Sequence, residues 1–150
     1  MTVATHSQRE TEDLARRFSA FLRAGDIVLL LGEMGAGKTA FVRGLAVGLG
    51  CGDVASSPTF ALMNRYEGGA LPLNHFDLYR LSSQEEAVDL DMIEEARGCV
   101  TAVEWPQVAG RWLADEARFT VTLDYDEAED VRLITVRGLR KEEMDALSCG

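Results

Sequence analysis

The sequence predicts an α/β fold, a three-layer sandwich with a mostly parallel central sheet. Strand-like segments alternate along the chain with segments of helical periodicity, which is the pattern of such folds. One strand-like segment, Ile27–Leu31, is apolar without interruption, as expected for a strand buried on both faces. The chain has 150 residues, of which 47% are apolar, so we expect one domain over residues 1–150 with a substantial core.

The first part of the chain is expected to form two helices with a strand between them. Apolar residues recur at helical spacing between Thr11, a suitable N-cap, and Gly25, a stop signal, which predicts the first helix. The strand Ile27–Leu31 follows it. After a glycine-rich stretch, apolar residues at helical spacing over 41–49 predict the second helix.

The remaining strands are predicted from short apolar or alternating runs that turn signals separate. The first two flank a pair of glycines, as in a hairpin, and the last two flank an acidic loop. The tail, residues 140–150, is expected to be a short helix or disordered. The predicted strands cover residues 60–66, 71–78, 100–103, 118–123 and 131–136.

A third helix is predicted between these strands, where two overlapping capping boxes occur. Ser82 with Glu85 forms one box and Ser83 with Glu86 forms the other, so either serine is a suitable N-cap. The helix is expected to end near Arg97, directly before a glycine.

The segment between the strand Ile27–Leu31 and the second helix fits G-x-x-x-x-G-K-[ST], the motif of phosphate-binding loops. Glycines let the backbone wrap round phosphate oxygens with its N–H groups inward, and the helix N-terminus adds partial positive charge. Lys38 is expected to reach the β- and γ-phosphates, and the Thr39 hydroxyl to hold Mg²⁺. The residues expected to contact the nucleotide here are Gly32-Glu33-Met34-Gly35-Ala36-Gly37-Lys38-Thr39.

This motif is specific enough to predict a P-loop NTPase-like fold. Average glycine usage gives a chance match in roughly one of two hundred chains of this length, and the strand–loop–helix setting lowers that frequency further. The loop reads phosphates rather than bases, so it leaves ATP and GTP open. The chain has no N/T-K-x-D element of the kind that guanine-specific proteins use.

Hydrolysis also requires a carboxylate near the metal and a group that positions water. In α/β sheets these groups lie at the C-terminal ends of parallel strands. Asp77 and Glu104 occupy such places by pattern, so both are candidate catalytic and metal-associated residues, although a capping or salt-bridging role fits each equally well. Thr59 is a candidate sensor of the γ-phosphate, although its spacing alone favours a rigid turn before a strand.

Four other residues near these candidates each have two interpretations. His75 lies in a largely apolar stretch with no second histidine nearby, which favours a satisfied core residue over a metal ligand. Arg43 and Arg80 are candidates for stabilising phosphate charge, but arginines at such places are more typical of surface ion pairs. Trp105 fits packing, with nucleotide or partner sensing as the alternative.

Composition narrows the class of protein and its compartment. The net charge of −10 argues against broad binding to nucleic acid or anionic membrane, since both need basic surface. The three cysteines are far apart and form no C-x-x-C pair, which disfavours zinc or redox sites and suits a reducing compartment. The N-terminal residues are polar, and Ile27–Leu31 is too short to cross a bilayer. We therefore expect a cytoplasmic protein without membrane contact.

Four short segments of the chain, taken together, carry a resemblance to a known protein family. They are Gly32-Glu33-Met34-Gly35-Ala36-Gly37-Lys38-Thr39, Ser57-Pro58-Thr59-Phe60, His75-Phe76-Asp77-Leu78-Tyr79-Arg80-Leu81 and Glu104-Trp105-Pro106. In this order, and in so short a chain, they resemble the TsaE (YjeE) family of bacterial ATPases. The loop is shared by many unrelated proteins, whereas the third and fourth segments are far more particular. The resemblance extends over residues 11–136.

The resemblance implies a Mg²⁺-dependent ATPase that supports synthesis of the threonylcarbamoyl adenosine modification beside the anticodon of tRNAs that read A-starting codons. It implies two partners, a TsaD-like protein that carries out the transfer and a TsaB-like protein, and hydrolysis that is weak in isolation. Carried to this chain, it implies that Lys38 contacts phosphates, Thr39 holds Mg²⁺ and Glu104 is metal-associated. It also implies that Asp77 is needed for activity and that Thr59 lies in a switch-like loop.

The chain departs from the family pattern at three places. Ala40 stands where the family often repeats threonine, and Asp91-Met92 replaces a common Gly-Leu; we expect both to be tolerated. The acidic loop at 124–130 lacks a basic residue that some relatives place near the nucleotide, which leaves the adenine and outer-phosphate contacts open.

Three functions remain open on the sequence. The leading one is an ATPase that drives a tRNA-modifying complex, in which the acidic charge assigns the tRNA contacts mainly to the partners. The second is a small-molecule phosphotransferase, such as a kinase, although no lid-sized insertion with clustered arginines is present. The third is a nucleotide-binding switch whose hydrolysis is incidental. The oligomeric state is left open.

Overall fold

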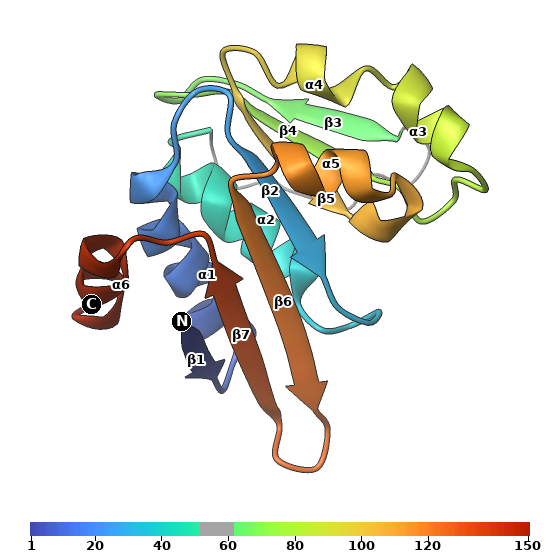
Figure 1. The fold of residues 1–150 in the computed structure, drawn as a ribbon. Helices are drawn as coiled ribbons and strands as arrows, with labels where there is room; N and C mark the ends of the chain where they lie inside the picture. Colours follow the sequence, from blue (N-terminus) through green and yellow to red (C-terminus); the bar gives the residue numbers. More distant parts are fainter. Residues whose placement is uncertain (52–61) are drawn as a thin grey trace.

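The computed structural model describes residues 1–51 and 62–150 (Figure 1). These residues form a seven-stranded sheet in the order β1-β7-β6-β2-β5-β4-β3. The four central strands, β6, β2, β5 and β4, are parallel, and the outer pairs are antiparallel. The strands are β1 (Thr2–Thr5), β2 (Ile27–Leu31), β3 (Met63–Tyr66), β4 (Leu73–Asp77), β5 (Val100–Glu104), β6 (Phe119–Asp126) and β7 (Val131–Arg137).

Helices cover both faces of this sheet. The helices are α1 (Gln8–Phe18), α2 (Lys38–Gly48), α3 (Gln84–Asp89), α4 (Met92–Glu95), α5 (Arg111–Glu116) and α6 (Lys141–Ser148). One apolar core lies between the sheet and α1 and α2, and a second lies between the sheet and α3, α4 and α5. The predicted three-layer α/β fold with a parallel central sheet is thus confirmed. Within the described part of the chain, no helix is long and apolar enough to cross a membrane.

Helix α1 begins earlier than the sequence predicted. Ser7, not Thr11, is its N-cap, because the Ser7 hydroxyl accepts a hydrogen bond from the Glu10 N–H at 3.1 Å. Thr11 is buried inside the helix, and its hydroxyl lies 2.9 Å from that of Thr5 on β1. The apolar pattern correctly located the helix, but it did not show which of the two hydroxyl residues is the N-cap.

The predicted third helix is divided into α3 and α4. Ser83 caps α3 through its hydroxyl, which accepts from the Glu86 N–H at 3.3 Å, so the second of the two capping boxes forms. Asp91 has φ 55° and breaks the helix. The left-handed conformation explains why glycine suits this position, and Asp is among the few other residues that adopt it. The strand predicted at 60–66 is observed from Met63, and its first two residues lie outside the described ranges.

Candidate functional site

The predicted phosphate loop is the connection between β2, which ends at Leu31, and α2, which begins at Lys38. Gly32 has φ 150° and Gly37 has φ 105°, both in the region that favours glycine. A Cβ on Gly32 would lie 2.5 Å from the backbone oxygen of Leu123 on β6, so no larger residue fits there. The two glycines let the loop lie close against β6 and turn directly into α2.

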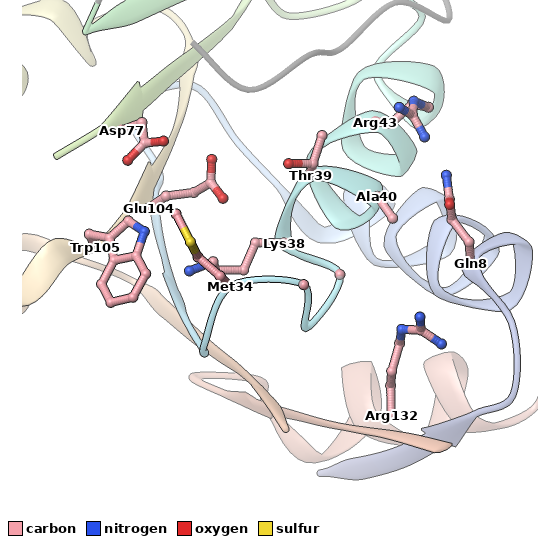
Figure 2. Close-up of a pocket in the computed structure, with 12 residues that line it drawn as sticks. Gln8, Met34, Lys38, Thr39, Ala40, Arg43, Asp77, Glu104, Trp105 and Arg132 are labelled. Atoms are coloured by element: carbon pink, nitrogen blue, oxygen red, sulfur yellow. The ribbon is translucent and has the colours of Figure 1, made fainter. Parts of the chain in front are cut away.

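A cavity of about 390 Å³ lies in front of this loop (Figure 2). The structure brings together on its wall seven of the residues that the sequence predicted for the site. They are Met34, Gly35, Gly37, Lys38, Thr39, Asp77 and Glu104.

Four of the other candidate residues, Gly32, Glu33, Ala36 and Arg80, are not on the cavity wall. Gly32, Glu33 and Ala36 complete the loop, and Ala36 is buried beneath it. Thr59 lies outside the described residues, so its role as a switch residue stays a prediction. Arg80 is exposed and is not part of the cavity wall, which leaves its phosphate role without support from the described residues.

The two candidate carboxylates meet because their strands are neighbours. In the parallel pairing of β4 with β5, Asp77 lies directly opposite Glu104, and Glu104 in turn lies opposite Leu30 of β2. Both acids therefore stand at the carboxyl edge of the sheet, where the phosphate loop leaves β2. Figure 2 shows both side chains on the same side of the cavity as Lys38 and Thr39. Asp77 is also fixed locally, because its Oδ1 accepts from the Tyr79 N–H at 3.0 Å.

Glu104 is buried and hydrogen-bonded to a residue that the sequence placed in the core. His75 Nε2 lies 2.6 Å from Glu104 Oε2. His75 is thus a buried, paired histidine, as the largely apolar stretch around it predicted, but its partner could not be read from the sequence. The two residues are 29 positions apart and meet only through the pairing of β4 with β5.

Two groups of the chain hold Lys38 at the end of the cavity where Asp77 and Glu104 lie. Its ammonium donates to the backbone oxygen of Gly32 and lies 3.8 Å from the centre of the Trp105 ring. Trp105 has φ 55°, and its ring contacts that of Tyr79 with 5.0 Å between centroids. Trp105 is therefore part of the cavity wall rather than only a packing residue.

The charge of Lys38 is carried in a largely buried position. Burial lowers the pKa of its ammonium from the usual value, while the negative charges of Glu104, Asp77 and Glu33 oppose that shift. A phosphate group entering the cavity would add negative charge beside this ammonium. The site is therefore suited to an anionic ligand.

The opposite end of the cavity is formed by Gln8, Arg43 and Arg132, of which the sequence indicated only Arg43, as a candidate for stabilising phosphate charge. Gln8 and Arg43 both donate to Glu12 Oε1, at 3.0 and 2.8 Å, so this end carries amide and guanidinium groups held by one carboxylate. Arg132 of β7 also lines the cavity, and its guanidinium lies 4.6 Å from the centre of the Tyr125 ring.

Arg132 lies on the cavity wall close to one of the departures from the family pattern. The acidic loop itself lacks a basic residue, but Arg132, two positions after it on β7, lines the cavity. Gln8 and Arg132 are far from the loop in sequence, so only the pairing of strands and helices brings them to it.

The oxygen atoms at the end of the cavity formed by Thr39, Asp77 and Glu104 would fit Mg²⁺ bound together with a nucleotide. Mg²⁺ prefers oxygen ligands and in nucleotide sites takes one or two carboxylates plus phosphates and water. The Thr39 hydroxyl and the carboxylates of Asp77 and Glu104 supply such atoms. The described residues contain no group of three or more His, Cys, Asp or Glu that could hold a metal ion.

Comparison with known proteins agrees with this architecture. The family model described as "Threonylcarbamoyl adenosine biosynthesis protein TsaE" matches residues 5–134. The tRNA threonylcarbamoyladenosine biosynthesis protein TsaE of Streptomyces coelicolor is 41% identical over 133 residues, which cover 85% of this chain and 89% of that protein. The protein of the same name from Bacillus subtilis is 39% identical over 112 residues, which cover 75% and 70%.

A solved structure shares the fold. The crystal structure of Bacillus subtilis YdiB is 29% identical to this chain, superposes with a TM-score of 0.74, and matches 99% of this chain and 94% of that one. The P-loop NTPase-like fold and the resemblance carried by the four motifs are both confirmed. The chain therefore belongs to the TsaE family, whose members take part in tRNA threonylcarbamoyladenosine biosynthesis.

Proposed function

We propose that this protein binds ATP with Mg²⁺ in the cavity at the phosphate loop and hydrolyses it to support threonylcarbamoyl adenosine modification of tRNA. One observation carries the proposal. The loop residues Lys38 and Thr39 face two carboxylates, Asp77 and Glu104, that adjacent parallel strands hold in register at the same edge of the sheet. Phosphate binding and metal-assisted hydrolysis require this combination of a cation, a hydroxyl and acids.

The residues of the loop are proposed to bind and orient the phosphates. Lys38 exchanges the Gly32 carbonyl and the Trp105 ring for oxygens of the β- and γ-phosphates. The N-terminal N–H groups of α2 donate to the same phosphates. Bound Mg²⁺ would supply compensation for the charge that develops on the transferred phosphoryl group.

The two carboxylates are proposed to divide the remaining work. Thr39 and Glu104 would hold the cation, and the Asp77 carboxylate would orient the attacking water or serve as a further metal ligand. Thr59 is proposed to sense the γ-phosphate from the switch-like loop. Gln8, Arg43 and Arg132 form the end of the cavity available to the rest of the nucleotide, which the resemblance favours as ATP.

The protein is proposed to act with TsaD-like and TsaB-like partners. Support comes from the relatives, whose names assign them to tRNA threonylcarbamoyladenosine biosynthesis, and from the acidic charge, which makes the isolated chain a poor direct ligand for tRNA.

The decisive experiment measures ATP hydrolysis by this chain with and without the two partner proteins. We expect slow hydrolysis alone and faster hydrolysis in the assembly. Glu104→Ala and Asp77→Ala are each expected to lower kcat by about a hundredfold, since each removes a group acting on the reacting atoms. If hydrolysis disappears in these variants while reconstituted tRNA modification survives at the normal rate, the protein is a nucleotide switch and the proposed role of hydrolysis is wrong.

A further inference from the structure

We propose that His75 is a positioning residue that orients the Glu104 carboxylate toward the phosphate loop and so determines how strongly a divalent cation strengthens nucleotide binding. The inference rests on the proposed function, in which Glu104 serves the metal. It adds a second residue, buried behind Glu104, without which the carboxylate would be free to turn.

The strand register places His75 behind the metal end of the cavity. His75 lies opposite Ala102, two positions before the pair formed by Asp77 and Glu104. Because side chains alternate along a strand, all four residues project from the same face of the sheet, the one that α2 covers. The small side chain of Ala102 leaves space in which the imidazole can reach diagonally across to Glu104.

Burial makes this contact decisive for the orientation of the carboxylate. His75 is 0% exposed and Glu104 is 3% exposed, so water cannot readily replace either partner. A buried carboxylate needs hydrogen bonds to remain charged. Within the described residues, His75 supplies that bond at 2.6 Å to Oε2, which leaves Oε1 for the cavity. Figure 2 shows the Glu104 carboxylate directed toward Thr39, as this division of its two oxygens requires.

The other nitrogen of the ring argues against a purely structural role. A carboxylate only accepts hydrogen bonds, so Nε2 is the donor in this pair, and Nδ1 is the second polar atom of the ring. Nδ1 is buried and has no hydrogen-bond partner in the described part of the chain. A histidine retained only for core stability would gain more with both nitrogens paired. The position instead favours one short bond to the site carboxylate over full satisfaction of the ring.

The test measures how Mg²⁺ changes the affinity for a non-hydrolysable ATP analogue. Its Kd is determined by calorimetry in EDTA and over a Mg²⁺ titration, for the wild type, His75→Leu and His75→Gln. Leucine removes the donor, whereas the glutamine Nε2 lies near the place of the histidine Nε2. We expect His75→Leu to raise about tenfold the Mg²⁺ concentration at which the increase in affinity for the analogue is half complete. The Kd measured in EDTA should not change. His75→Gln should restore most of the lost Mg²⁺ dependence.

Controls separate this role from folding and from the proposed function. Thr101→Val alters another buried polar residue of β5 and should leave the Mg²⁺ dependence unchanged. Glu104→Gln should lower that dependence by itself, and adding His75→Leu should then cost nothing more. If His75→Leu does not fold, His75→Asn, which withdraws the donor from the Nε2 position, replaces it.

These measurements separate the positioning role of His75 from the metal role of Glu104. If Glu104→Gln lowers the Mg²⁺ dependence but His75→Leu does not, or if His75→Leu weakens binding equally in EDTA and Mg²⁺, the positioning role is overturned and the proposed function stands. If neither variant changes the Mg²⁺ dependence, the metal role of Glu104 is itself wrong, and the inference falls with it.

Discussion

The ammonium of Lys38 is held between the Gly32 carbonyl and the face of Trp105, in a site suited to phosphate. A cation–π contact contributes about 0.5–2 kcal/mol, depending on its exposure. Charge-assisted hydrogen bonds to phosphate are stronger than bonds to neutral acceptors, so a nucleotide is able to draw the ammonium away. Movement of Lys38 toward a phosphate would therefore remove a positive charge from the face of the Trp105 ring.

Binding of MgATP is therefore expected to change the fluorescence of Trp105, because a charge leaves its ring. The chain has a second tryptophan, Trp112, in α5, which provides a matched control. Trp112→Phe should retain the nucleotide-dependent change, and Trp105→Phe should abolish it. A change of equal size in Trp105→Phe would show that the signal arises elsewhere and that Lys38 does not leave the ring.

Helices α1 and α2 approach one another so closely that glycine is required at their contact. A Cβ on Gly44 would lie 2.2 Å from the backbone oxygen of Glu12 and 2.7 Å from the Ala15 Cβ. This packing also brings Glu12 to Arg43, so the close approach of the two helices builds the end of the cavity opposite Asp77 and Glu104.

Gly44→Ala is expected to destabilise the protein by about 1–3 kcal/mol. Alanine favours a helix over glycine by about 1 kcal/mol, but here the added methyl meets backbone that cannot move without separating α1 from α2. Urea unfolding measures the difference. Val47→Ala, at an exposed position of the same helix, is the control and should change stability by less than about 0.5 kcal/mol. A stabilised Gly44→Ala variant would contradict the packing argument.

The elements themselves were predictable where their periodicity was strong. The strand Ile27–Leu31 and the strands on both sides of the acidic loop follow from local pattern, and the structure confirms them. The short elements β1 and α5 were not predicted, since four or six residues carry too little periodic signal. Strand β1 exists because β7 offers it an edge, with Val3 opposite Ile134. Such elements depend on their neighbours rather than on their own sequence.

At the scale of the whole molecule, a network of charges fastens the C-terminal helix to the body of the protein. The Arg118 guanidinium contacts Asp26 Oδ2 at 2.8 Å and Glu143 Oε1 at 3.0 Å, and Arg140 contacts the same Glu143 oxygen at 2.9 Å. The tail that the sequence left open between helix and disorder is therefore the helix α6, which lies beside α1 (Figure 1).

This network predicts a pH-dependent contribution to stability. Hydrogen bonds from the Arg140 side chain and backbone, with the charge of Arg118, lower the pKa of Glu143 below its usual value of 4.5. A carboxyl with a lowered pKa stabilises the folded state fully above pH 4.5, and that contribution is lost as the pH falls through the folded pKa. Glu143→Gln should therefore lower Tm by roughly 2–4 °C at pH 7 and by progressively less below pH 4.5.

Glu142→Gln is the matched control for this measurement. Glu142 pairs with Arg140 at 3.3 Å, but its side chain is 69% exposed, so solvent screens the pair. Its Tm should stay close to that of the wild type at every pH. If the gap between Glu143→Gln and the wild type does not narrow in acid, ionisation of Glu143 is not the source of the stability.

The net charge of −10 is the other property of the whole molecule that has a functional consequence. Neutralising tRNA phosphates requires a basic surface, so we expect no complex of the isolated chain with tRNA tighter than about 100 μM at physiological salt. Filter binding with and without the partner proteins measures this. Tight binding by the chain alone would place tRNA contacts on this protein rather than on its partners.

The sequence by itself determined the phosphate loop, because its chemistry depends on residues 32–39 in direct succession and on the strand and helix that flank them. It also indicated Asp77 and Glu104 as acids that follow apolar strands. Only the tertiary structure decided that these acids lie side by side, that His75 holds Glu104, and that Arg132 reaches the cavity. The reason is that contacts between residues far apart in the chain depend on strand order and register, which no local pattern encodes.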